Sequence, residues 1–262
     1  MVVLSSFNLK KKKGFTLIEL SIVIVIIGLI VAGVVGGQSL VRQAKIRSLI
    51  SDYNKYQIAM NTFKLEYSSL AGDLSNASNY GIGNDGNGDK RIFHENSEVL
   101  YAWQHLGAAN LVQGTYTGAD AGNPDDQIGV NVPKTSFGDS VTAIFSYLTD
   151  SVSGGNDNCL GTNTSLLFGL HGGFNVLSFG KLQDIHDNCP VLPFLKVAEA
   201  HGIDNKIDDG LADSGILFSA NQSDTNNDGN RCVDNNVRGT GGANYDFDET
   251  GVTCRLIFKL GR

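Results

Sequence analysis

The chain of 262 residues has little that marks an enzyme. It contains no GxSxG, HExxH or Walker pattern, so the common signatures of serine hydrolases, zinc proteases and P-loop proteins are missing. Its five histidines are dispersed along the chain and lack the spacing of metal ligands. We therefore expect a protein that is not an enzyme.

Proline and cysteine are also scarce. Four prolines against 32 glycines argue against a proline-rich stalk and favour a domain with many loops and tight turns. The four cysteines include no CxxC pair, so a zinc site or a thioredoxin-like redox pair is not expected. An even number of cysteines in an exported chain predicts two disulfides, with three possible connectivities.

Positive charge is sparse outside the first residues. The formal net charge is −7, and four of the 20 basic residues are the consecutive lysines at positions 10–13. Removal of the first 14 residues would leave 248 residues with a net charge of −11. Because so acidic a chain binds nucleic acid poorly, we do not expect nucleic acid as a partner.

Charge almost disappears directly after the lysines. The 23 residues 15–37 carry a single charge, Glu19. As a helix this segment would measure about 35 Å, enough to cross a bilayer core of about 30 Å. A carboxylate inside such a segment costs on the order of a few kcal/mol unless a partner neutralises it. The sequence therefore predicts a membrane-spanning helix in which Glu19 has a function.

A resemblance to type IV pilins and to the pseudopilins of type II secretion systems rests on seven consecutive residues, Lys13-Gly14-Phe15-Thr16-Leu17-Ile18-Glu19. It implies cleavage after Gly14 by a membrane-embedded prepilin peptidase and N-methylation of Phe15, the new N-terminus. It also implies that Glu19 pairs with the Phe15 amino group of a neighbouring subunit. Such a pair is physically reasonable, because an ammonium and a carboxylate satisfy each other in a low-dielectric medium.

The resemblance further implies partners and a location. The partners are the prepilin peptidase, copies of this chain or other pilins, an inner-membrane assembly platform and the cytoplasmic membrane. The chain would cross that membrane once with its N-terminus in the cytoplasm, as the lysines at 10–13 favour. Its remaining residues would lie outside the cytoplasm and then enter a periplasmic or cell-surface filament.

Two other classes of N-terminal segment compete with this interpretation. A secretory signal peptide also has a basic stretch before an apolar run, but here the run is longer than usual and contains Glu19. A plain uncleaved membrane anchor explains the apolar length, but explains neither Gly14-Phe15 nor Glu19.

The apolar run continues into an amphipathic pattern without a break. Beyond Gln38, apolar residues recur at steps of three and four, and no proline interrupts residues 15–67. This predicts one helix of about 53 residues. Four glycines in its apolar half fit either close helix packing or a point where the helix can stretch: Gly28, Gly33, Gly36 and Gly37.

The predicted fold class is α+β. The apolar half of the long helix protrudes, and the amphipathic half packs on a small antiparallel sheet with long loops. Residues 1–14 are then a leader, 15–37 the membrane and assembly segment, and 38–262 the amphipathic half with a globular head. The predicted strands are residues 141–148, 166–170, 174–179, 216–218 and 255–260.

A short amphipathic helix is predicted at about residues 97–110, with Ser97 as its N-cap. Within it, Trp103-Gln104-His105-Leu106 resembles a stretch found in longer prepilin-like proteins, as do residues 204–210. We expect His105 to pack beside Trp103 within the fold.

Of the three disulfide connectivities we favour the two local pairings, Cys159–Cys189 and Cys232–Cys254. The second resembles the C-terminal disulfide loop that many pilins carry. The alternative is four free buried thiols.

Residues 224–230 fit the start of a calcium loop, with glycine at the sixth position and oxygen side chains at alternate positions: Asp224, Asn226, Asp228 and Asn230. The twelfth position is Asn235, where an EF-hand has a bidentate glutamate, so acids at 234, 246, 248 or 249 would have to complete the site. A poorer version of the pattern contains Asp85, Asn87 and Asp89. Either stretch can instead be an acidic surface loop, which leaves Ca²⁺ as a candidate cofactor.

The function we expect is that of a structural subunit of a type IV pilus-like filament, polymerised through its hydrophobic N-terminal helix. Two alternatives stay open. One is a pseudopilin whose short periplasmic filament drives protein secretion. The other is a membrane-tethered periplasmic module that binds calcium or glycan and never polymerises.

Overall fold

The computed structural model describes residues 14–93, 97–118, 127–148, 173–182, 190, 192–220, 231–234 and 244–260. The chain divides between Ala44 and Lys45 into two compact units. We call residues 45–262 the head.

One long helix links the two units in sequence. Helix α1 runs from Leu17 to Tyr67 over 51 residues, and it continues without a break through Gly36 and Gly37. The predicted helix of residues 15–67 is therefore confirmed to within two residues. The absence of proline and the apolar stripe of its second half are the signals that made this prediction possible.

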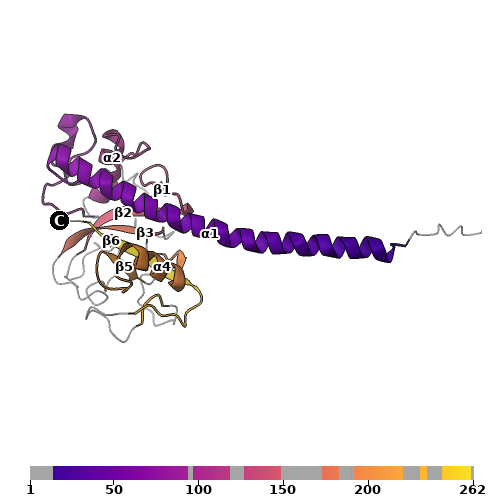
Figure 1. The fold of residues 1–262 in the computed structure, drawn as a ribbon. Helices are drawn as coiled ribbons and strands as arrows, with labels where there is room; N and C mark the ends of the chain where they lie inside the picture. Colours follow the sequence, from indigo (N-terminus) through magenta and orange to yellow (C-terminus); the bar gives the residue numbers. More distant parts are fainter. Residues whose placement is uncertain are drawn as a thin grey trace, which may run out of the picture. The chain divides into compact units, whose positions relative to one another are not determined.

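The head contains a six-stranded antiparallel sheet (Figure 1). The strand order is β1-β2-β3-β6-β4, and β5 also pairs with β6. The strands are β1 (Lys134–Thr135), β2 (Gly138–Leu148), β3 (Phe174–Lys181), β4 (Leu195–Lys196), β5 (Leu217–Ala220) and β6 (Val252–Lys259). A long apolar helix with a small antiparallel sheet confirms the α+β class.

Four of the five predicted strands correspond to observed ones: β2, β3, β5 and β6. The fifth prediction, residues 166–170, lies outside the described residues. The two-residue strands β1 and β4 were missed, because so short a strand leaves no alternating pattern in the sequence.

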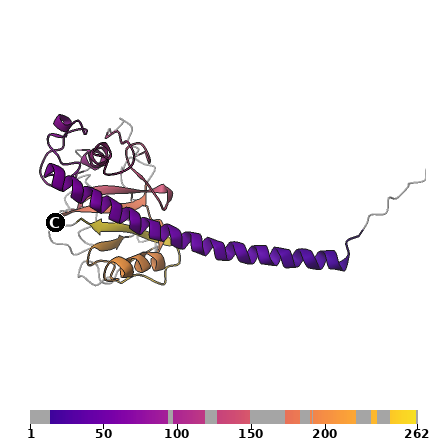
Figure 2. The same cartoon turned by 45° about the horizontal axis from the view of Figure 1, so that its top comes forward.

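The second half of α1 packs on the sheet with one stripe of side chains, and the two views show it crossing the strands (Figures 1 and 2). Tyr53 stacks on Phe258 of β6 with ring centroids 4.0 Å apart, and Tyr56 stacks on Phe179 of β3 at 6.4 Å. Tyr56 also meets Trp103, on a neighbouring helix, edge-on at 4.9 Å. The buried stripe repeats at helical spacing: Leu49, Asp52, Tyr53, Tyr56, Ala59, Met60 and Phe63.

A carboxylate fixes the position of α1 along the sheet. Asp52 is buried, and its carboxylate accepts the N–H of Ser136 at 2.6 Å and the Ser136 hydroxyl at 3.0 Å. Ser136 lies in the turn between β1 and β2. A charge-assisted pair of bonds at one point prevents α1 from sliding along its apolar stripe.

Three short helices complete the described part of the head: η1 (Ala77–Tyr80), α2 (Glu98–Ala108) and α4 (Val197–Ile207). Helix α2 confirms the helix predicted at 97–110. Ser97 is at the predicted N-cap position, but it does not cap the helix with its side chain. Ser97 occupies the cap position with a left-handed backbone, φ 59°, and its hydroxyl makes no capping bond. Helix α4 was missed, because Gly202 in its middle and the Asp204-Asn205 pair are weak helix formers.

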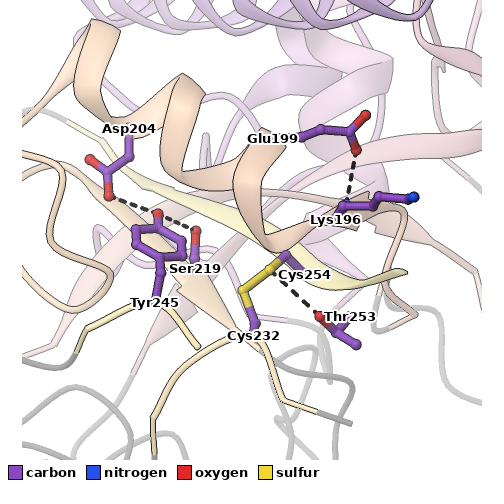
Figure 3. Close-up of a disulfide and its surroundings, with 8 residues drawn as sticks. All are labelled: Lys196, Glu199, Asp204, Ser219, Cys232, Tyr245, Thr253 and Cys254. Atoms are coloured by element: carbon purple, nitrogen blue, oxygen red, sulfur yellow. Dashed lines mark hydrogen bonds between the residues drawn. A yellow bond between two sulfur atoms is a disulfide. The ribbon is translucent and has the colours of Figure 1, made fainter. Parts of the chain in front are cut away.

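A disulfide joins Cys232 to Cys254 of β6, as expected for the C-terminal loop (Figure 3). The bond closes a segment of 22 residues. Loop closure of this length stabilises a fold by about 3 kcal/mol in the chain-entropy account. Cys159 and Cys189 lie outside the described residues.

Candidate functional site

The predicted cut site lies directly in front of α1. Gly14, Phe15 and Thr16 precede the first helical residue, Leu17, and Phe15 is 89% exposed. A Cβ atom placed on Gly14 would meet no described atom within 4 Å. The fold of the chain therefore does not require glycine at position 14, and a requirement for glycine there would come from a partner that binds this segment.

Thr16 and Glu19 form a reciprocal capping box at the start of α1. The Thr16 N–H donates to Glu19 Oε2 at 2.8 Å, and the Thr16 hydroxyl donates to the same oxygen at 2.9 Å. The Glu19 N–H lies 3.2 Å from Thr16 Oγ1, which accepts it. We missed this role of Glu19, although the Thr-x-x-Glu pattern is visible in the sequence.

The apolar half of α1 has an exposed surface in the isolated chain. Its large apolar side chains from Leu17 to Val35 are 49–87% exposed, and among the described helices α1 is the one that is long and apolar enough to cross a membrane. A Cβ atom would also meet no described atom within 4 Å at any of four glycines: Gly28, Gly33, Gly36 and Gly37. This surface is therefore free to contact lipid or other helices.

The predicted calcium residues have different outcomes. Asp224, Asn226, Asp228 and Asn230 lie outside the described residues. In the poorer version of the loop, Asp85 accepts the N–H of Ser78 at 2.7 Å and its hydroxyl at 2.9 Å. Asn87 and Asp89 each accept the N–H two residues further along. Local hydrogen bonds therefore account for the oxygen-rich pattern of this loop.

A carboxylate cluster that we did not predict lies at the end of α4. Asp204, Asp208 and Asp209 each place an oxygen within 4.8 Å of the other two. The buried Asp204 accepts the Tyr245 hydroxyl at 2.7 Å, and Tyr245 is 2.8 Å from the hydroxyl of Ser219 (Figure 3). Burial, with the nearby charges of Asp208 and Asp209, raises the pKa of Asp204 to about 6.

The other two members of this cluster, the half-buried Asp208 and the exposed Asp209, organise the loop that leads to β5. Asp208 accepts the N–H groups of Ile216 and Leu217, the second at 2.8 Å. Asp209 accepts the N–H of Leu211 at 2.9 Å. Each carboxylate retains lone pairs beyond these bonds, so the cluster combines a loop-ordering role with oxygen atoms that suit a hard cation.

Helix α2 holds the loop before it through two adjacent side chains. The Gly72 N–H donates to Nδ1 of His105 at 3.0 Å, and Nε2 of His105 lies 2.7 Å from the Asn84 carbonyl. Both bonds require a neutral imidazole with its proton on Nε2. Gln104 accepts the Asn84 N–H at 2.9 Å. His105 is buried in the fold, where it also stacks on Phe63, so it joins three parts of the head.

Two buried carboxylates hold the rest of this loop. Asp73 accepts the Lys90 N–H at 2.9 Å, and Glu98 accepts the N–H groups of Asn87 at 3.0 Å and Phe93 at 2.9 Å. Burial raises the pKa of both carboxyls. Nothing in the sequence distinguishes these acids from the surface acids around them, and both roles were missed.

The His105 bonds predict a loss of stability in acid. Burial lowers the pKa of His105 below 6.5, although the Asn84 carbonyl and the nearby Asp85 partly oppose this. The unfolded chain then binds the proton more readily, so the contribution of His105 is complete above about pH 6.5 and is lost as the pH falls toward the folded pKa. Asp73 and Glu98 have raised pKa values in the folded head, so the folded state binds their protons more readily than the unfolded chain does. Protonation of these two carboxyls in acid therefore stabilises the fold and partly offsets the loss from His105.

A comparison with His105→Gln isolates this contribution. The full chain in detergent is unfolded by urea at pH 7.5 and at pH 5. We expect the variant to be less stable at pH 7.5 by about 1–3 kcal/mol, since a buried donor loses its acceptor. The difference from the unmodified chain should narrow at pH 5; an equal difference at both pH values would contradict the neutral imidazole.

The N-terminal residues match a known family model. Residues 9–35 fit the prokaryotic N-terminal methylation motif, which is the prepilin signature of type IV pilins and pseudopilins. The match contains the predicted cut site, the capping box and most of the apolar half of α1. No curated protein and no solved structure matches the chain. The motif implies processing by a prepilin peptidase and assembly with other pilins.

Proposed function

We propose that the chain is a structural subunit of a type IV pilus-like filament, cut after Gly14, N-methylated at Phe15 and polymerised through the apolar half of α1. The observation that carries the proposal is the methylation motif at residues 9–35, which coincides with a helix whose apolar side chains are exposed. A soluble monomer with such a surface would aggregate, so the segment needs lipid before assembly and other helices after it.

Glu19 gives the polymerisation its selectivity. A carboxylate among apolar helices is costly alone, but it is satisfied when the Phe15 ammonium of another subunit lies beside it. Cleavage creates this ammonium, because the Phe15 nitrogen is an amide in the uncut chain. Processing and assembly are thereby coupled: an uncut chain can enter the membrane, yet it cannot offer the cation that its neighbour needs.

The head supports a structural role. Its described part is held by a disulfide, an aromatic stripe on α1 and the Asp52–Ser136 bonds. The disulfide ties the Cys232 segment to β6, and the other two features connect the sheet to the second half of α1. A force applied to the helix by neighbouring subunits would therefore be carried by the packed core of the head.

Shearing of surface filaments tests the proposal. Filaments sheared from cells that produce the chain are examined by electron microscopy and immunogold labelling, and their peptides are identified by mass spectrometry. We expect labelled filaments that contain peptides of the head. If the chain remains entirely in the membrane fraction while other pilins are sheared off, it is a tethered module.

The same experiment separates a pilus subunit from a secretion pseudopilin, which fits the same N-terminal motif. A pseudopilin forms a short periplasmic filament, so shearing releases little of it. Deletion of the chain would then block the export of folded proteins and leave surface filaments intact. A pilus subunit gives the opposite result in both measurements.

We further propose that the acidic C-terminal part of the head binds Ca²⁺. Two features support this: the oxygen-rich residues 224–230, and the three carboxylates of Asp204, Asp208 and Asp209 within 4.8 Å of one another. The hard oxygen donors of both features suit this ion, and a cation would relieve the repulsion within the cluster.

Calcium is then expected to stabilise the full chain. Thermal unfolding in detergent should shift upward by several degrees in millimolar Ca²⁺ relative to EGTA, because a ligand that binds only the folded state stabilises it. Asp228→Asn tests whether residues 224–230 contribute to the calcium-dependent shift, and Asp208→Asn tests the same for the carboxylate cluster. The same unfolding temperature in EGTA and in Ca²⁺ would contradict calcium binding by the head.

A further inference from the structure

The Glu19 carboxylate is not free to rotate in the structure. Two hydrogen bonds from Thr16 end on its Oε2 at the N-terminal end of α1, and the Glu19 N–H in turn donates to the Thr16 hydroxyl oxygen. A glutamate side chain on an exposed helix surface otherwise populates several rotamers. The hydroxyl and the N–H of Thr16 select one of them.

We propose that Thr16 is a positioning residue for filament assembly, which acts by holding the Glu19 carboxylate where the Phe15 amino group of a neighbouring chain can bind it. The inference rests on the proposed function and adds to it a residue with a stated role. Because Oε2 receives both Thr16 donors, the second carboxylate oxygen is left to accept the ammonium.

The capping box survives the cut. Its atoms belong to Thr16 and Glu19, and both residues lie on the mature side of the Gly14–Phe15 bond. The Thr16 N–H remains an ordinary amide after cleavage, since only the Phe15 nitrogen changes from an amide to an amine. The carboxylate is therefore held in the same place before and after processing.

The setting makes the two donors important. Within a membrane no water is available to replace a lost donor, so a carboxylate depends on protein groups. The N-terminal end of a helix also favours an anion through its unpaired N–H groups. Loss of the Thr16 hydroxyl removes one of the two donors, so the rotamer of Glu19 is then restrained by the Thr16 N–H alone. The neighbouring chain would then have to order the carboxylate further when it binds.

The test compares substitutions in the full chain in cells that form filaments. Thr16→Val removes the hydroxyl but keeps the branched shape, while Thr16→Ser keeps the hydroxyl. Ser21→Ala is the matched control, because the Ser21 hydroxyl donates to the Ile18 carbonyl at 2.8 Å in the same segment and not to Glu19. The mature N-terminus is identified by mass spectrometry, and the sheared filaments are quantified by immunoblotting.

Thr16→Val should be cut like the unmodified chain, but its filament yield should fall by about tenfold, the effect of one charge-assisted hydrogen bond. Thr16→Ser should stay within about twofold, and Ser21→Ala should have no effect. Added to Glu19→Ala, Thr16→Val should cause no further loss, because its only route of action is then gone.

Several results would overturn the role of Thr16. If Thr16→Val forms normal filaments and Glu19→Ala forms none, Thr16 has no role in assembly, and the proposed function is unaffected. An equal defect in Thr16→Ser would show that the hydroxyl is not the cause. An uncut Thr16→Val chain would place the residue in the processing step. Normal filaments from Glu19→Ala would instead overturn the assembly mechanism itself.

Discussion

Replacement of Glu19 by alanine is expected to leave cleavage after Gly14 intact and to reduce the incorporation of the chain into filaments by at least about a hundredfold. Removing one partner of a buried ion pair costs about 3–5 kcal/mol, because the other charge stays buried without compensation. In the proposed filament the uncompensated charge would be the Phe15 ammonium of the adjacent subunit. The variant also loses the capping box at the start of α1.

The measurement compares the sheared and the membrane-bound pools of the chain by immunoblotting, with the N-terminus of each pool checked by mass spectrometry. Glu66→Ala is the control, because Glu66 lies on the same helix but in the head, far along the chain from the cut. Filaments of normal yield from Glu19→Ala would count decisively against assembly through this carboxylate.

Replacement of Gly14 by valine is expected to block processing almost completely. The chain itself has room for a side chain at this position, since no described atom lies within 4 Å of a Cβ placed there. A block would therefore arise in the peptidase, which has to bind the backbone of residue 14 closely. The uncut chain should keep the mass of its leader and should be missing from filaments.

Gly28→Val provides a matched comparison for this prediction. Gly28 is also open to a side chain and lies in the same unit of the chain, but it is 14 residues beyond the cut. Its substitution should leave cleavage unchanged, whatever it does to helix packing. Normal cleavage of Gly14→Val would move the processing site elsewhere or show that the leader is retained.

The long helix and the main strands could be predicted because their signals are repeated along the chain. A carboxylate-bearing apolar run, an amphipathic stripe and the absence of proline together define α1 almost to the residue. Strands β2, β3 and β6 have enough β-branched and aromatic residues to be recognised. Helix α4 is harder to recognise, since Gly202 lowers the helix propensity of its middle, and its N-terminus is capped by the Lys196 N–H donating to Glu199 rather than by a typical N-cap residue.

The candidate site divides in the same way. Gly14, Phe15 and Glu19 belong to one continuous run of seven residues, so the sequence displays the pattern directly. His105, by contrast, forms hydrogen bonds to Gly72 and Asn84, and Asp204 accepts a hydrogen bond from Tyr245, which is 41 positions away in the sequence. Such contacts depend on how loops fold back on the helices, which no local pattern encodes. The Thr16–Glu19 box is the exception: it is local, visible in the sequence, and still missed.

We propose that the chain becomes a filament subunit by a cut that creates the Phe15 amino group. Mass spectrometry of the N-terminal peptide of the chain, taken from sheared filaments, tests this most directly. We expect a peptide that begins with N-methylated Phe15, with no leader residue attached. An intact leader, or a chain found only in the membrane with an unmodified N-terminus, would contradict it.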